Sequence, residues 1–222
     1  MLDHILAFLL LVVIPARALW RSRTRRLNQE PKTTRYLTTI GLVGGLLAFL
    51  VLDWHVARRP VEALGLGIPS ATPALVGLAI TVTLLTALAI LVRRKAGEGS
   101  AIAERARREL LPATPNEVRL FLLLTMAVGF GWEVLYRGFL LFYLPAHVGL
   151  AAAVVASAVA YGAAHGFKSP GQFVGSIVAA LAFAVGYALT DNLWWLIVLH
   201  TGLPLLTLSG RKGSGVGTEP GR

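Results

Sequence analysis

Hydrophobic residues occur in seven long runs along this 222-residue chain, and most polar positions lie between these runs. A run of roughly 17–25 predominantly apolar residues is long enough to cross the hydrocarbon core of a bilayer as a helix. The predicted helices cover 2–20, 37–54, 74–92, 118–144, 148–165, 172–190 and 193–209. The pattern therefore predicts an all-α protein, a polytopic membrane helix bundle with about seven transmembrane helices.

Composition agrees with this class and suggests one domain. Hydrophobic residues make up 55% of the chain and charged residues 14%, whereas a soluble domain carries about 25% charged residues. We expect a single transmembrane domain over 1–209, with a motif-bearing core at about 112–208. The Gly-rich end, residues 210–222, is expected to be a disordered cytoplasmic tail.

The first apolar run resembles a signal peptide, because Ala16-Arg17-Ala18 imitates a cleavage site. Two features argue against cleavage. The residues before the run include Asp3 but no Lys or Arg, and the flank after the run is densely basic. We therefore expect a retained first helix with its N-terminus outside the cell.

Positive charges are distributed unevenly between the two sides of this predicted topology. Seventeen Lys and Arg residues fall in the first, third and later alternate loops and in the tail, and the opposite loops hold only Arg58 and Arg59. The positive-inside rule then places the C-terminus in the cytoplasm. The net charge of +10 thus indicates contact with a lipid bilayer, and the absence of any nucleic-acid motif argues against a nucleic-acid partner.

Segment 93–117 contains AIAERARREL, whose apolar positions recur with helical spacing. It could lie on an anionic membrane surface as an amphipathic helix. It could equally be a solvated basic loop that only fixes the topology.

The ionisable residues Glu133, Arg137, His165 and His200 lie inside hydrophobic stretches in the second half of the chain. Such groups are costly at membrane depth, usually face a cavity or one another, and are functional candidates. Glu133 and Arg137 are four residues apart and so share a helix face. They could form a purely structural ion pair. A carboxylate with two imidazoles could also activate water or bind a metal.

Three motifs in the second half of the chain resemble those of one family. Trp132-Glu133-x-x-x-Arg137 is followed by Tyr161-x-x-x-His165 and then by His200-x-x-x-Pro204. The order is similar to that of the CAAX protease and bacteriocin-processing family of type II CAAX prenyl endopeptidase-like intramembrane proteases. Their pattern is Glu-Glu-x-x-x-Arg, Phe-x-x-x-His and His-x-x-x-Asn or Asp.

The resemblance implies an intramembrane endopeptidase in the cell (inner) membrane of a bacterium, acting on a membrane-associated protein or peptide. It implies that Glu133, Arg137, His165 and His200 are catalytic. The chain departs from the family pattern at Trp132, which replaces the first glutamate, and at Pro204, which replaces the final Asn or Asp. These two departures favour an alternative, a catalytically inactive relative that acts as a membrane binding or scaffold protein.

Two mechanisms are compatible with the proposed catalytic set. In the first, Glu133 and His165 deprotonate water, His200 stabilises the oxyanion and Arg137 keeps Glu133 ionised. In the second, Glu133, His165 and His200 bind zinc and leave one position for water. No compact His-Glu-x-x-His motif is present, which lowers the expectation of a metal. A transporter or structural role is disfavoured, because no pair of broken helices is apparent.

The predicted topology places Glu133 and His165 at different depths in the membrane, although catalysis requires them to meet. Glu133 falls well outward along the fourth predicted helix, whereas His165 falls near the cytoplasmic end of the fifth. Either the fourth helix enters the bilayer later than residue 118, or the segment after His165 is buried in the protein. We favour the late entry, with residues 112–120 at the interface.

Overall fold

The computed structural model describes residues 1–24, 30–94 and 111–209, and within these ranges every regular element is a helix. The first membrane helix is continuous, with α1 (Leu2–Phe8), a π-helical stretch (Leu9–Val13) and α2 (Ile14–Arg23). The next are α3 (Lys32–Val56), a short 3-10 helix (Val61–Leu64) and α4 (Thr72–Arg94). The expected all-α fold is confirmed.

The fourth membrane helix is the longest. It comprises α6 (Pro115–Glu133), a π-helical segment (Val134–Phe139), α7 (Leu140–Tyr143) and α8 (Pro145–Val148). The chain ends with α9 (Leu150–Ala164), α10 (Pro170–Thr190) and α11 (Trp194–Ser209). All seven predicted helices are therefore present.

Five of the helices are long and apolar enough to span a membrane, and α9 and α11 are shorter apolar helices. Both ends of α9 are set by glycines in left-handed backbone conformations, Gly149 (φ 78°) and Gly166 (φ 72°), which residues with a side chain rarely adopt. The predicted helix at 148–165 is shortened at these glycines.

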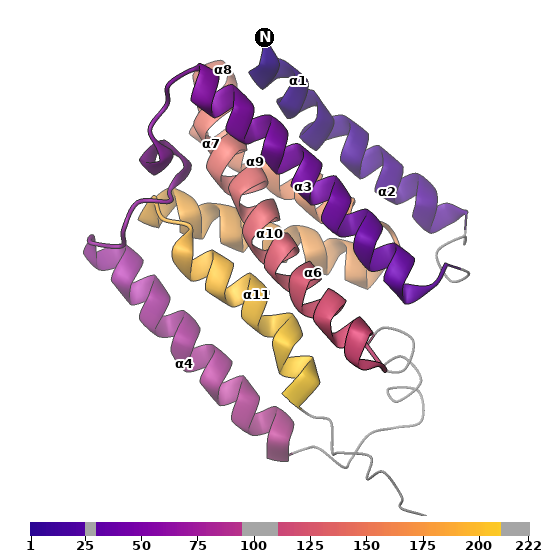
Figure 1. Cartoon of the computed structure of the whole chain (residues 1–222). Helices are drawn as coiled ribbons and strands as arrows, with labels where there is room; N and C mark the ends of the chain where they lie inside the picture. Colours follow the sequence, from indigo (N-terminus) through magenta and orange to yellow (C-terminus); the bar gives the residue numbers. More distant parts are fainter. Residues whose placement is uncertain (25–29, 95–110, 210–222) are drawn as a thin grey trace, which may run out of the picture.

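Two helices from the second half of the chain, α6 and α9, each pack against two neighbouring helices. α6 packs against α3 on one side and α11 on the other, while α9 packs against α10 and α2. α4 contacts mainly α11 and lies at the edge of the bundle (Figure 1). The largest buried cluster includes the π-helical segment of the fourth membrane helix, with Leu135, Tyr136 and Phe139 fully buried.

The connections lie at two opposite ends of the bundle. At one end, Lys32 Nζ donates to Leu111 O (2.9 Å) and the Phe167 amide donates to Ser22 Oγ (3.0 Å). At the other end, Arg59 contacts Asp3. Arg21 and Lys32, two described residues that the positive-inside pattern assigns to the cytoplasmic side, therefore lie at the end of the bundle opposite Arg59.

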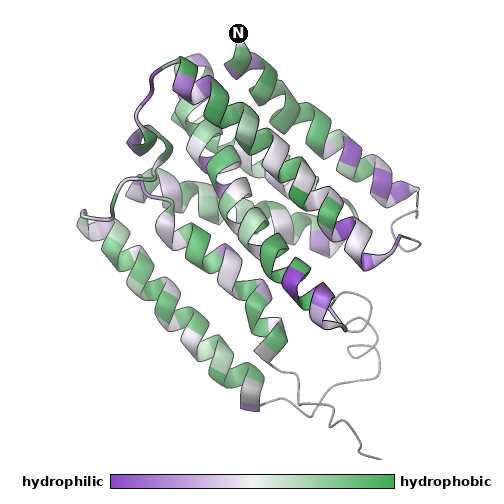
Figure 2. Cartoon of the chain, in the orientation of Figure 1, coloured by the Kyte–Doolittle hydropathy of each residue, from purple (hydrophilic) through white to green (hydrophobic). Residues whose placement is uncertain are grey.

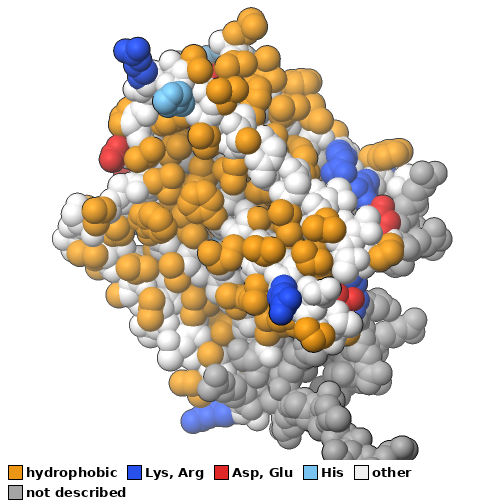
Figure 3. All heavy atoms as spheres, in the orientation of Figure 1, with side chains coloured by type: hydrophobic (Ala, Val, Ile, Leu, Met, Phe, Trp, Pro, Cys, Tyr) orange, Lys and Arg blue, Asp and Glu red, His pale blue; other side chains and the backbone are white. Residues whose placement is uncertain are grey.

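The surface is that of a membrane protein. Apolar residues run along the helices, and the most hydrophilic positions lie near helix ends (Figure 2). Hydrophobic side chains cover much of the face in Figure 3, and the Lys and Arg side chains are scattered singly or in small groups among them. Exposed Val51, Val174 and Val178 are examples of the apolar side chains available to lipid.

Two predictions fall outside the described residues: the disordered tail at 210–222 and the amphipathic segment around AIAERARREL. The fourth membrane helix begins at Pro115, where Thr114 and Glu117 form a reciprocal capping box. From Pro115 to Val148 it spans 34 residues, or about 51 Å at 1.5 Å per residue. That length exceeds the roughly 30 Å hydrocarbon core and is compatible with the predicted late entry.

Candidate functional site

Glycines bring the fourth membrane helix close to both neighbours, just before the polar residues. A methyl group at Gly129 would overlap the side chain and backbone of Thr201 on α11, and one at Gly131 would overlap Val43 on α3. Such small residues let membrane helices approach closely. The next turn, which carries Glu133, is consequently surrounded by protein.

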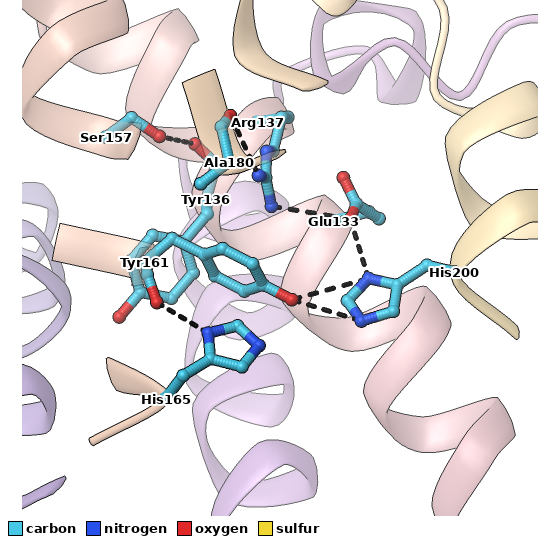
Figure 4. Close-up of polar contacts among 8 residues, drawn as sticks. All are labelled: Glu133, Tyr136, Arg137, Ser157, Tyr161, His165, Ala180 and His200. Atoms are coloured by element: carbon cyan, nitrogen blue, oxygen red, sulfur yellow. Dashed lines mark hydrogen bonds and ion pairs between the residues drawn. The ribbon is translucent and has the colours of Figure 1, made fainter. Parts of the chain in front are cut away.

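Glu133 forms the centre of a buried polar chain that links α6 to α11. Its Oε1 lies 2.7 Å from His200 Nδ1 and accepts a longer hydrogen bond of 3.3 Å from Arg137 (Figure 4). The side chains of Glu133 and Arg137 are completely buried, and that of His200 is 16% exposed. The predicted Glu133–Arg137 pair is therefore present, with an imidazole as a third member.

Arg137 also holds the neighbouring helices in place. One guanidinium nitrogen donates to the backbone oxygen of Ala180 on α10 (3.2 Å), and the group lies 4.2 Å from the ring centre of Tyr161 on α9. A cation over an aromatic face gains roughly 2 kcal/mol or more when desolvated. The Arg137 side chain thus fixes Glu133 relative to both α9 and α10.

Tyr161 contacts both histidines of the predicted site. Its hydroxyl lies 3.1 Å from His200 Nε2 and 3.4 Å from Nδ1. Its ring packs edge-on against His165, with 4.7 Å between ring centres. His165 Nδ1 lies 3.0 Å from the backbone oxygen of Tyr161. Because a carbonyl can only accept, Nδ1 carries the proton, and Nε2 of a neutral His165 is an acceptor.

A cavity of about 280 Å³ lies among α3, α6 and the end of α9. Its lining consists of Arg35, Tyr36, Thr39, Leu124, Val128, Trp132, Tyr161, Ala164 and His165. Among the described residues, Tyr161 and His165 of the polar site line this cavity, whereas Glu133, Arg137 and His200 do not. The cavity is mainly apolar, with basic Arg35 among its lining residues.

The structure brings together only part of the predicted catalytic set. Glu133, Arg137 and His200 are connected, but Glu133 is paired with His200 rather than with His165. His165 lies on the cavity side of Tyr161, and its Nδ1 is engaged by its own helix. The catalytic roles of these four residues remain predictions.

The proposed zinc site does not fit this geometry. Within residues 1–24, 30–94 and 111–209, no group of three or more His, Cys, Asp or Glu side chains is placed to hold a metal ion. Glu133 and His200 supply two ligands, but His165 packs against Tyr161 instead of joining them. Glu133, His165 and His200 as metal ligands therefore stay a prediction that this arrangement does not favour, and no step is assigned to a metal.

In the described part of the chain, three buried side-chain atoms have no hydrogen-bond partner: Glu133 Oε2, Arg137 Nε and Thr201 Oγ1. Buried polar groups are almost always paired, and each exception needs an explanation. Two of these three atoms belong to the Glu133–Arg137 pair. The pair is therefore less completely satisfied than a structural ion pair would be.

Sequence reasoning missed Tyr161 as a partner of His200. The signal was present, since Tyr161 stands where the family pattern has Phe and so adds a hydroxyl at that position. The two other departures also have structural consequences. Trp132 forms part of the cavity wall, and Pro204 lies inside α11. Because proline has no amide hydrogen, the His200 carbonyl lacks its usual helical donor.

Comparison with known proteins gives one result. Residues 114–206 match the family described as Type II CAAX prenyl endopeptidase Rce1-like. No curated protein and no solved structure matches the chain. The matched residues include all three motifs and every member of the polar chain. The part of the chain that carries this site therefore matches the type II CAAX prenyl endopeptidase Rce1-like family, in agreement with the resemblance of its motifs.

Proposed function

We propose that this membrane protein is an intramembrane endopeptidase, which hydrolyses a peptide bond of a membrane-associated protein or peptide with water activated by the Glu133–His200 pair. The observation that carries the proposal is the 2.7 Å contact between the fully buried carboxylate of Glu133 and the imidazole of His200, both in the segment that matches the family. The family supports the class of reaction. A bacterial inner membrane is the location that the resemblance to bacterial members favours.

The chemistry requires a base, a stabilised oxyanion and a proton for the leaving amine. A carboxylate that accepts from an imidazole holds the ring in one orientation and stabilises it when it takes up a proton. Glu133 and His200 have this relationship. Arg137 donates a hydrogen bond to the carboxylate and so holds it in place. General-base assistance of this kind typically contributes about 10²–10⁴-fold in rate.

His165 and the cavity suggest where the substrate binds. The free acceptor, Nε2 of a neutral His165, belongs to a residue of the cavity wall. It can orient a water molecule there, or donate to an oxyanion when protonated. The apolar wall of Leu124, Val128 and Trp132 suits a hydrophobic substrate side chain.

The decisive experiment is proteolysis of a panel of membrane-tethered peptides by the purified full-length chain in lipid vesicles. We expect cleavage of at least one peptide by the native chain and a loss of about 10²–10⁴-fold in Glu133→Gln, because the amide keeps the shape but is a far weaker base. Asp3→Asn is a matched control, since Asp3 also pairs with an arginine but lies at the end of the bundle near Arg59. Equal cleavage by Glu133→Gln and the native chain would show that the site is assigned wrongly.

A second candidate, an inactive relative that binds membrane proteins, is favoured by one observation. The indole of Trp132 lines the cavity at the position of the family's first glutamate. If that glutamate is indispensable, no peptide in the panel is cleaved by the native chain, and Trp132→Glu gains hydrolysis. Cleavage by the native chain excludes this candidate.

A further inference from the structure

The Glu133–His200 pair has no direct access to the cavity. Glu133 has no exposed surface, and among the described residues neither side chain contributes to the cavity wall. The His200 side chain is 16% exposed, but it does not line the cavity, so water held there is separated from the pair. A group that contacts both the cavity and His200 can connect the two.

Tyr161 is placed to be that group. It lines the cavity, and its hydroxyl lies 3.1 Å from His200 Nε2. Its ring is held between the Arg137 guanidinium at 4.2 Å and the His165 ring at 4.7 Å. These contacts fix the phenol on two sides, so the hydroxyl has a defined position relative to His200.

The direction of the hydrogen bonds follows from the chemistry of each group. An ionised carboxylate can only accept, so His200 Nδ1 carries the proton that points to Glu133 Oε1. Nε2 of the neutral imidazole is then an acceptor, and the Tyr161 hydroxyl donates to it. Once its proton is directed to His200, the phenolic oxygen can accept a hydrogen bond from water in the cavity.

We propose that Tyr161 is a catalytic residue, a proton relay between water in the cavity and the Glu133–His200 pair. This inference rests on the proposed endopeptidase function. As the water oxygen bonds to the peptide carbonyl carbon, a water proton passes to the Tyr161 oxygen while the tyrosine proton passes to His200 Nε2. The imidazolium is stabilised by Glu133. When the C–N bond breaks, the transfer reverses, and the amine nitrogen receives its proton through Tyr161.

The test compares two buried tyrosines in the full-length chain, with a peptide that the native chain cleaves. Tyr161→Phe removes the relay hydroxyl and keeps the ring that packs on Arg137 and His165. Tyr136→Phe is the matched control, because the Tyr136 hydroxyl is also buried and donates to Leu10 O (3.0 Å), away from His200. We expect Tyr161→Phe to lower kcat by about 10²-fold or more with little change in KM, and Tyr136→Phe to remain within a few fold of the native chain.

A solvent isotope measurement separates a relay from a structural role. Transfer of two protons in one step gives a curved dependence of kcat on the deuterium fraction of the solvent, and the residual activity of Tyr161→Phe should lose that curvature. If Tyr161→Phe does not fold, 3-fluorotyrosine at position 161 keeps the shape and the hydroxyl but makes it more acidic. We then expect the alkaline limb of the kcat profile to move to lower pH.

The outcomes distinguish this proposal from the endopeptidase function. Native-level kcat in Tyr161→Phe, an equal loss in both variants, or an unchanged pH profile with fluorotyrosine overturns the relay, while cleavage by the native chain still supports the endopeptidase. Failure of the native chain to cleave any peptide overturns both.

Discussion

Arg59 and Arg137 each contact acidic side chains, but the two sites are built in different ways. Arg59 makes two hydrogen bonds of 2.7 Å to the two oxygens of Asp3, and a longer one of 3.4 Å to Asp53. Arg137 makes one bond of 3.3 Å to Glu133, and both Glu133 Oε2 and Arg137 Nε remain without a partner. The partly exposed pair is thus the better satisfied, and the fully buried pair the worse.

The difference indicates which cluster is structural. The Arg59 cluster joins α1, the end of α3 and the following loop, and the carboxylate of Asp3 raises the pKa of the Arg59 guanidinium above its ordinary value. Bidentate pairs of this kind are the strong, geometrically specific ones. The Glu133 cluster instead leaves a carboxylate oxygen free at a position where an unpaired polar atom costs about 1–3 kcal/mol. Unpaired buried polar atoms of this kind are characteristic of functional sites, where the chemistry of the site takes precedence over stability.

The largest effect is expected for Arg137→Gln. This change leaves Glu133 as an uncompensated buried charge, and loss of one partner of a buried pair typically costs about 3–5 kcal/mol. We expect a corresponding loss in the free energy of unfolding, measured in detergent or lipid, and a loss of peptide cleavage. If stability is unchanged, Glu133 is not ionised in the native protein and the proposed base is wrong.

A smaller, purely structural effect is expected for Arg59→Gln. The Arg59 side chain is 24% exposed, so solvent screens part of the interaction, and we expect a loss of about 1 kcal/mol. Cleavage per folded molecule should stay at the native level, because the contacts described for the Arg59 side chain, with Asp3, Asp53, Trp54 and Phe142, include no residue of the polar site. A large fall in cleavage by folded Arg59→Gln would remove the distinction between the two clusters.

The smallest energetic effect is expected for Pro204→Ala. Alanine restores the backbone donor to the His200 carbonyl, which proline cannot supply. Membrane helices tolerate proline because nearby groups compensate, so we expect a gain of no more than about 1 kcal/mol in unfolding measurements. A strong loss of stability would show that the proline ring is needed for packing of α11.

Cysteine-accessibility labelling can show which end of the bundle faces outward without changing a residue of either arginine cluster. The chain has no cysteine, so single substitutions at Arg21, Arg58 and Arg107 can be probed one at a time. We expect Arg58→Cys to react with an impermeant reagent from outside, and Arg21→Cys and Arg107→Cys only after the membrane is permeabilised. The reverse pattern would invert the topology; Arg107 itself lies outside the described residues.

The helices were predictable because each depends mainly on local composition, as the agreement between 172–190 and Pro170–Thr190 shows. The pairing of Glu133 with Arg137 also follows from spacing along one helix. The contact between Glu133 and His200 joins residues 67 positions apart, and no periodicity encodes it. The sequence favoured His165 as the partner, and only the packing of the Tyr161 ring against both Arg137 and His165 shows otherwise.

The Arg59 cluster was missed for the same reason. Asp53 lies in the last turn of α3, where we expect a charge to reach water, but its side chain is 9% exposed and contacts Arg59. The interaction depends on Asp3, which is separated from Arg59 by 56 residues. Neither partner could be identified from its own neighbourhood.

The burial of Glu133 and Arg137 in one long helix also constrains biosynthesis. Insertion of a single charged side chain at the centre of a membrane helix costs roughly 2.5–3.5 kcal/mol, and the segment Pro115–Val148 leaves the ribosome before the helices that supply Ala180 and His200. During that interval the two charges have only each other. We expect this segment to remain at the insertion machinery until α11 has been made, so that release into lipid and completion of the site occur together.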